Sequence, residues 1–241
     1  MNSRKKRRNA IRARKTVDKT FKTKPKAEEY IRKHFSKMKK IMFDDKYGLT
    51  KAVLEGRKIM TRRIISREKY PLLYSWQQNR LRFEILGNDT LRVWYKAEPQ
   101  SLRTIDHFDI RIPLQIGEVV AVAQSYHALN KAGFVAPEWC EHTCEDSPGY
   151  SNKMFVRADL MPYQIRITNV RVERMQDISD EDCLNEGVFL GQFHTYSYVG
   201  RPRCPFNTPR DAFASLIDRI SGKRTWASNP WVFVYEFELV K

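Results

Sequence analysis

The order of strand-like and helix-like segments limits the fold of this 241-residue chain more than any other feature of its sequence. About six segments have the β-branched and aromatic pattern of strands, and a few shorter ones have the spacing of helices. The two kinds do not alternate regularly, and no Gly-rich phosphate loop follows a strand, so a doubly wound fold is disfavoured. The pattern predicts an α+β fold, with a small, mainly antiparallel β-barrel and short flanking helices.

The end of the chain gives the clearest strand signal. Residues 229–240 place four aromatic side chains on one face of a strand: Trp231, Phe233, Tyr235 and Phe237. Strands are also predicted at 116–126, 153–160 and 163–175, and a hairpin at 81–98 turns at the sequence GND. Residues 189–207 are rich in aromatic residues, Pro and Gly, and they are predicted to form a loop.

Helices are predicted where a capping residue, an apolar stripe and a terminal Gly follow one another. Residues 49–56 end at Gly56, which can take the left-handed position just past a helix. The acidic segment 177–188 has Ser179 as its cap and Gly187 as its stop, and residues 208–222 form the clearest helix. A short amphipathic helix is also predicted within 26–43.

Positive charge is concentrated at the start of the chain. Residues 1–40 hold 17 Lys and Arg against three acidic residues, which accounts for +14 of the formal net charge of +16. Residues 1–37 are predicted to form a basic, largely disordered arm that carries the amphipathic helix and favours polyanions such as RNA. A solubilising leader, or a start of translation at Met38, would explain the same residues.

Several function classes are disfavoured by composition. No apolar run is long enough for a membrane helix, no secretory signal is present, and the cysteines are few, so a cytoplasmic protein without membrane contact is expected. Cys140, His142 and Cys144 lie close together but lack a local fourth ligand, so loop packing is favoured over a metal site. No metal and no other cofactor are predicted, and the oligomeric state is left open. Trp139, Tyr196 and Tyr198 are interpreted as loop residues near a cleft.

The most informative short stretch is LEGRKIMTRR, residues 54–63, which gathers four cations and a hydroxyl behind a helix end. A solvated turn, a phosphate-binding segment and a catalytic Lys/Thr pair would all have this composition. Glu186 stands apart from the other acidic residues of 177–188, because it lies at the C-terminal end of a helix, where the dipole disfavours a carboxylate. A cationic or hydroxyl group facing Glu186 would explain its position.

Four blocks of sequence together resemble the ASCH domain, a relative of the PUA-like RNA-binding fold, in the larger form found in bacterial and phage genomes. The blocks are AVLEGRKIMTRRI, IGEVVAV, the segment 154–188 that ends in the acidic helix and EG, and NPWVFVYEFELV. The resemblance covers about Lys39 to Lys241 and implies one ASCH domain at 38–241, with added segments near 66–115 and 128–150. It also implies an RNA or nucleoside site in a cleft where the GRK block meets the acidic helix.

The resemblance further implies specific site residues. Compact ASCH members are similar to amidohydrolases that remove the acyl group from N4-acetylcytidine, and the matching catalytic positions here are Lys58, Thr61 and Glu186. A Thr hydroxyl needs a base, and a Lys can act as one when burial or neighbouring cations lower its pKa. The neighbouring cations Arg57, Arg62 and Arg63 would act in that direction and are candidates for binding an anionic ligand.

Two departures from the family pattern bear on catalysis. Ile59 replaces the Thr common after GRK, and Gln124 stands where related sequences often have a carboxylate. The favoured interpretation is therefore an RNA- or nucleoside-binding domain. The alternatives are an N4-acylcytidine amidohydrolase and an accessory protein whose GRK block is only a surface turn.

Overall fold

The computed structural model describes residues 38–75, 81–87, 89–96, 105–134, 145–200 and 205–240. All of these except Met38 belong to one compact unit, Lys39–Lys241. The predicted basic arm, 1–37, lies outside the described residues. Residues 40–41, near the end of the predicted amphipathic helix, form the short strand β1 (Lys40–Ile41) instead.

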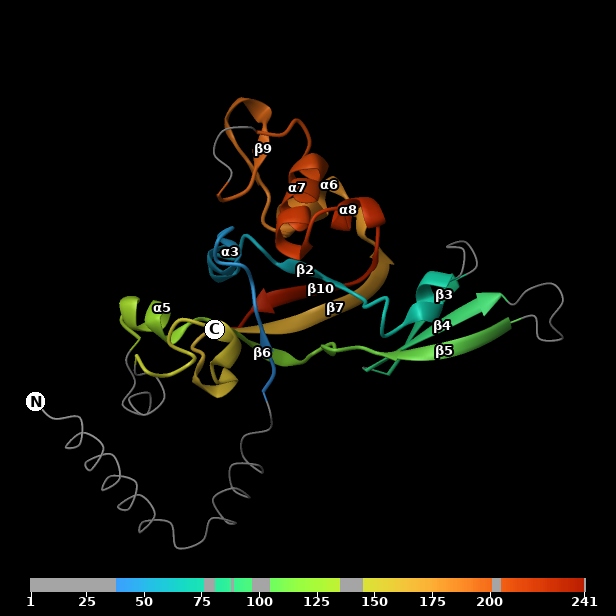
Figure 1. The fold of residues 1–241 in the computed structure, drawn as a ribbon, viewed down its shortest axis with the longest axis horizontal. Coiled ribbons are helices and arrows are strands. Elements are labelled where there is room, and N and C mark those ends of the chain that lie inside the picture. The colour runs from blue at the N-terminus through green and yellow to red at the C-terminus, as the bar shows by residue number, and fades with distance from the viewer. Residues whose placement is uncertain are drawn as a thin grey trace, which may run out of the picture. The chain divides into compact units, whose positions relative to one another are not determined.

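The main sheet contains five strands in the order β1-β6-β7-β10-β2 (Figure 1). β1 is parallel to β6 (Val119–Val122), and all the other pairs are antiparallel. β10 (Trp231–Leu239) lies between β7 (Gln164–Arg174) and β2 (Met60–Ile64). The predicted α+β class with a mainly antiparallel sheet is confirmed.

The predicted closed barrel is not confirmed. In the described part of the chain the two end strands, β1 and β2, do not pair with each other. A side chain joins their neighbourhoods instead, because Arg63 Nη2 on β2 donates to the Met42 carbonyl just after β1 at 2.7 Å.

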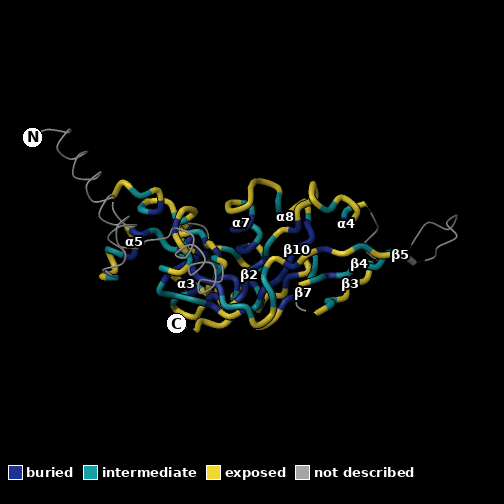
Figure 2. The backbone as a smooth tube through the Cα atoms, turned by 90° about the horizontal axis from the view of Figure 1, so that it is seen from below, coloured by how far each residue is buried: buried dark blue, intermediate teal, exposed yellow. Residues whose placement is uncertain are grey.

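Strand β10 is buried on both of its faces, as Figure 2 shows for the centre of the sheet. The four aromatic residues predicted on one face all belong to the larger core cluster: Trp231, Phe233, Tyr235 and Phe237. Val232 and Val234, on the other face, pack with Met60 and with α7 residues in a second cluster. β10 therefore anchors both cores of the unit.

The added segment 66–115 carries its own structure. It contains α4 (Pro71–Ser75) and an antiparallel sheet of β3 (Leu81–Leu86), β4 (Thr90–Lys96) and β5 (Ile105–Arg111). The predicted hairpin is β3–β4. The side chains of Leu91, Val93 and Ile110 in this small sheet pack in the larger core cluster, so the added segment is part of the same domain core.

Three predicted helices are confirmed, and their local signals act as expected. α3 (Leu49–Leu54) is followed by Gly56 with φ of +70°. α6 (Asp180–Asn185) begins where the Ser179 side chain accepts a hydrogen bond from the Asp182 N–H, and Thr208 caps α7 (Pro209–Ser221) in the same way. Two further helices of the described part, α5 (Tyr126–Lys131) and α8 (Thr225–Ser228), are short.

Two local predictions were wrong. Residues 153–160 form two 3₁₀ turns, Lys153–Phe155 and Ala158–Leu160. Asn152 caps the first turn, and Lys40 Nζ donates hydrogen bonds to the carbonyls of Met154 and Val156, which are then not available for strand pairing. Within the predicted loop 189–207, β8 (Phe189–Leu190) and β9 (Tyr196–Ser197) form a small hairpin across a 3₁₀ turn, Gln192–His194. A further 3₁₀ turn, Met175–Asp177, links β7 to α6.

The aromatic residues interpreted as lying near a cleft have different positions. Tyr198 is buried in the larger core, where its hydroxyl and Ser215 Oγ are 3.0 Å apart. Tyr196 is half-buried in the short strand β9, and Trp139 lies outside the described residues.

We predict that Gly187→Ala destabilises the protein more than Gly222→Ala. Both glycines have strongly positive φ, +108° and +105°, so each substitution should cost about 1–3 kcal/mol in backbone strain. At Gly187 an added Cβ would also lie 2.9 Å from Leu49 Cδ2, whereas at Gly222 it meets nothing within 4 Å. Urea unfolding of both variants measures the difference, and equal losses would contradict the close packing of α6 against α3.

Candidate functional site

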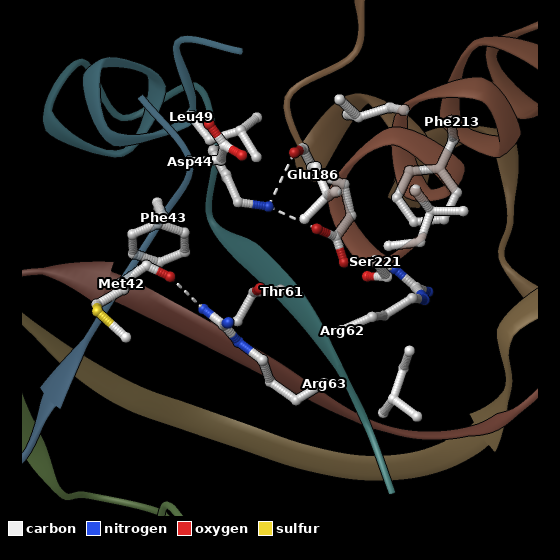
Figure 3. A pocket seen from close by; sticks show the side chains of 15 residues that line it. Met42, Phe43, Asp44, Leu49, Thr61, Arg62, Arg63, Glu186, Phe213 and Ser221 are labelled. Carbon is white, nitrogen blue, oxygen red and sulfur yellow. Dashed lines mark hydrogen bonds and ion pairs between the residues drawn. The ribbon is translucent and has the colours of Figure 1, made fainter. Parts of the chain in front are cut away.

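A pocket of about 240 Å³ lies between the segment after β1 and strand β2, with α3, the end of α6 and α7 around it (Figure 3). We call it the edge pocket. Apolar side chains form much of its wall, among them Phe43, Leu49, Phe213 and Leu216. Its charged and hydroxyl groups include Asp44, Lys58, Thr61, Arg63 and Glu186. The combination of an apolar wall and a few convergent polar groups is typical of small-molecule sites.

Lys58 and Glu186 meet in this pocket as a buried ion pair. Lys58 Nζ donates to Glu186 Oε2 at 2.5 Å and to the Glu186 carbonyl at 2.8 Å. The two side chains are only 2% and 6% exposed. Burial lowers the pKa of the Lys58 ammonium below its ordinary 10.5, while the charge of Glu186 opposes this fall.

The chain turn after α3 delivers Lys58 to this position. The backbone N–H groups of Arg57 and Lys58 both donate to the Ala52 carbonyl, at 2.9 and 3.0 Å, and Gly56 supplies the positive φ that the turn needs. The next N–H, of Ile59, donates to the Asn185 carbonyl at the end of α6. The residues just before β2 and the end of α6 are therefore held together by a backbone hydrogen bond as well as by the Lys58–Glu186 ion pair.

Glu186 caps the C-terminus of α6, and the prediction that a cation faces it is confirmed. Its Oε2 contacts Lys58, and its Oε1 accepts from Arg62 Nη1 at 3.2 Å. Two buried cations thus compensate a carboxylate at the negative end of a helix.

Arg62 is fully engaged with carboxylates, and its side chain is only 1% exposed. Besides Glu186 it donates to Glu173 Oε1 through Nε and Nη2, and to Asp182 Oδ2 at 2.6 Å. Burial acts to lower the pKa of Arg62, but the charges of Glu186 and Glu173 raise it above its ordinary value. These contacts leave Arg62 to orient Glu186 and do not present its guanidinium to an anionic ligand.

The other two arginines of the block have separate positions. Arg63 lines the edge pocket, donates to the Met42 carbonyl and lies over the Phe43 ring at 5.6 Å, and burial lowers the pKa of its guanidinium. Arg57 is exposed, pairs with Glu55 at 2.6 Å and does not line the edge pocket. Of the three predicted anion-binding residues, Arg62 and Arg63 line the pocket and Arg57 does not, and the guanidinium of Arg62 is already held by carboxylates.

Thr61 lies on β2 opposite Tyr235 of β10, and it lines the edge pocket together with Lys58 and Glu186. Figure 3 shows Thr61, Arg63 and Glu186 around the same space. Within the described residues the Thr61 side chain makes no hydrogen bond, although it is only 5% exposed. The Thr61 oxygen is not among the buried polar atoms that lack a partner, so it is open to the pocket and free to pair with a ligand there.

Sequence reasoning did not single out Asp44 or the α7 residues of the pocket. Phe213 and Leu216 were recognisable only as the apolar stripe of α7, and the sequence around Asp44 gives no site signal. Gln124, noted as a departure from the family pattern, does not line the edge pocket.

The cysteines add no metal site to the described part of the chain. Cys183 is the buried residue of α6, and burial raises the pKa of its thiol to about 12. Cys140, His142, Cys144 and Cys204 lie outside the described residues, and within those residues no His, Cys, Asp and Glu side chains gather in a metal-binding group. None of the described helices has the length and apolar character needed to cross a bilayer.

No family model, curated protein or solved structure matches the chain.

We predict that Glu186→Gln destabilises the protein more than Lys58→Met does. Glu186→Gln leaves Lys58 and Arg62 without their shared carboxylate and should cost about 3–5 kcal/mol, the range for breaking a buried ion pair. Lys58→Met leaves Glu186 with Arg62, so the loss should be smaller. Chemical denaturation of both variants and of the double variant provides the comparison, and the reverse order would contradict the role given to Arg62.

The pH dependence gives this prediction a second readout. Without Glu186 the pKa of Lys58 in the folded state falls further, so the unfolded chain binds more protons than the folded variant over a wider pH range. The stability of Glu186→Gln should therefore rise more steeply with pH than that of the wild type, and the gap between them should narrow as the pH rises toward 10.5, the ordinary pKa of lysine.

Proposed function

We propose that the edge pocket binds a nucleoside, either free or as a nucleotide of RNA. One observation carries the proposal: the Lys58–Glu186 pair and the unbonded Thr61 hydroxyl converge in a single pocket with an apolar wall. A nucleobase has apolar faces and a polar edge, so it can pack against Phe43 and Leu216 while its edge meets these groups. The volume of about 240 Å³ lies below the usual 300–1,000 Å³ of drug-sized sites and suits a single base-sized group.

The ASCH-type assignment is part of the same proposal. The positions that match the family motif, in the GRK block and at the end of the acidic helix, are 128 residues apart and meet at one pocket. On this assignment the five-stranded sheet corresponds to the PUA-like barrel, with the Arg63–Met42 hydrogen bond in place of backbone pairing between its end strands. This meeting of the motif residues supports the assignment.

We predict saturable binding of cytidine-type nucleosides to the full chain, measured by isothermal titration calorimetry. Thr61→Val keeps the side-chain shape and removes the hydroxyl, so it should weaken binding about fivefold, the loss of one hydrogen bond worth about 1 kcal/mol. Arg57→Ala, a nearby change outside the pocket, should leave the affinity unchanged.

The control separates pocket binding from arm binding. Affinity for an uncharged nucleoside should not respond to salt, whereas affinity for single-stranded RNA should fall steeply with salt because of the basic residues at 1–40. Absence of binding for all tested nucleosides, or equal effects of Thr61→Val and Arg57→Ala, would refute the proposed site.

A second function, amide hydrolysis of N4-acylated cytidine, is favoured by the state of Lys58. Its pKa is lowered, so its amine can be neutral at lower pH than that of an exposed lysine and can accept a proton. In the proposed reaction neutral Lys58 takes the Thr61 proton as the Thr61 oxygen attacks the acyl carbon. Lys58 then returns the proton to the departing N4 amine, leaving an acyl ester on Thr61. Water hydrolyses this ester, which releases the carboxylic acid and restores the Thr61 hydroxyl.

Glu186 would hold the Lys58 amine toward Thr61 in this scheme, through the hydrogen bond to its Oε2. Arg62 would keep the other carboxylate oxygen occupied and the carboxylate fixed. Such a carboxylate positions the base without exchanging a proton with the substrate.

We predict that N4-acetylcytidine is converted to cytidine and acetate, with turnover followed by the change in absorbance of the base. Lys58→Ala should lower the rate by about 10²- to 10⁴-fold, the usual effect of losing a general base. Because the base form of Lys58 is required, the rate should rise with pH and level off below 10.5. Turnover that survives Lys58→Ala would refute this mechanism, and binding without turnover would leave nucleoside binding as the function.

A further inference from the structure

The edge pocket adjoins a second, wider hollow of about 670 Å³, which we call the outer groove. The two share Met42, Phe43, Asp44 and Ile220 in their linings, so they are neighbours on the surface. The outer groove is otherwise lined largely by polar residues, including Ser125, Ser151 and Asn152. A ligand whose base fills the edge pocket would extend its remaining atoms into this groove.

The charged side chains of the outer groove differ in the partners that they have within the protein. Asp45 Oδ1 accepts from Lys153 Nζ at 2.9 Å and also from the Thr50 hydroxyl. Lys46 Nζ lies over the Tyr47 ring at 5.6 Å from its centroid. The carboxylate of Asp45 is thus neutralised by a cation within the groove.

Asp44 is placed differently. It lines both hollows, and its side chain accepts one hydrogen bond, from the Lys46 backbone N–H to Oδ1 at 2.8 Å. Among the described residues the Asp44 carboxylate has no ion pair and no second hydrogen bond. Figure 3 shows it beside Leu49 among the side chains that line the edge pocket. An ionised carboxylate can accept several hydrogen bonds, so acceptor capacity is left at the junction of the two hollows.

We propose that Asp44 binds the ribose hydroxyls of the nucleoside whose base lies in the edge pocket, which makes a ribonucleoside the ligand class. This inference rests on the proposed function. A carboxylate is a common acceptor for ribose hydroxyls, and the junction is where the atom chain from base to sugar must pass. The serine and asparagine groups of the outer groove are uncharged, which suits a neutral polyol.

The other use of Asp44 would be to accept from an exocyclic amine of the base. The position of Asp44 argues against this use. Lys58, Thr61 and Glu186 line the edge pocket but not the outer groove, whereas Asp44 lines both and so lies at their junction. The two uses make different predictions for a base without a sugar.

The test compares each of the four ribonucleosides, its 2′-deoxy counterpart and the matching free base, titrated against the full chain by calorimetry. The wild type should bind the preferred ribonucleoside about tenfold or more tighter than the deoxynucleoside, the effect of one hydrogen bond to a charged group. Asp44→Asn should reduce this preference severalfold, because its amide oxygen accepts a hydrogen bond without a charge, and it should leave the affinity for the free base unchanged.

Asp45→Asn is the matched control, because it removes the same charge from the same groove but at a carboxylate already bound by Lys153. It should retain the ribose preference. Equal wild-type affinities for ribo- and deoxyribonucleosides would overturn the inference without requiring any variant to fold. Equal weakening of the free base by Asp44→Asn would also overturn it, by assigning Asp44 to the base. Binding of none of the ligands would refute the proposed function itself.

Discussion

The buried contact between Lys58 and Glu186 is the constraint on which the surrounding structure depends. Removing both charges from water costs several kcal/mol each, and this cost is recovered only if the partners hold close, well-oriented contact. The end of α6 must therefore sit against the start of β2. The Ile59–Asn185 backbone hydrogen bond has the same effect. Gly187 follows Glu186 with a φ of +108°, which side chains rarely adopt, and an added Cβ there would also crowd Leu49.

An ion pair of this kind is a weak source of net stability, since well-packed apolar residues of similar volume often serve as well or better. The ion pair has a different consequence, which is that it leaves the pocket beside it unfilled. α7 packs its apolar residues against β10 and Met60, while the ion pair holds α6 beside them without filling the space above Thr61. A purely apolar contact would tend to close that space, because apolar interiors pack densely. The buried ion pair is thus better explained by keeping the edge pocket open than by adding to the stability of the fold.

Much of the local structure was predictable, because its causes are local. Ser179 and Thr208 cap their helices through N–H groups within three residues, and the alternation of 229–240 identifies a strand with both faces buried. Even the cationic contact of Glu186 followed from the helix dipole. Residues 153–160 could not be assigned correctly, since Lys40, more than a hundred residues earlier, holds the carbonyls of Met154 and Val156. The parallel pairing of β1 with β6 likewise depends on residues about 80 positions apart.

The roles of the basic block could not be separated from sequence, because they follow from the two faces of strand β2. Successive side chains of a strand point to opposite faces, so Met60 and Arg62 share one face, and Thr61 and Arg63 share the other. The first face meets the carboxylates of Glu173 and Asp182, which occupy Arg62. The second face meets the open edge near Met42, which leaves the Thr61 hydroxyl without a hydrogen bond and places Arg63 in the lining. One strand thereby holds the Glu186 carboxylate through Arg62 on one face and places Thr61 and Arg63 in the pocket lining with the other.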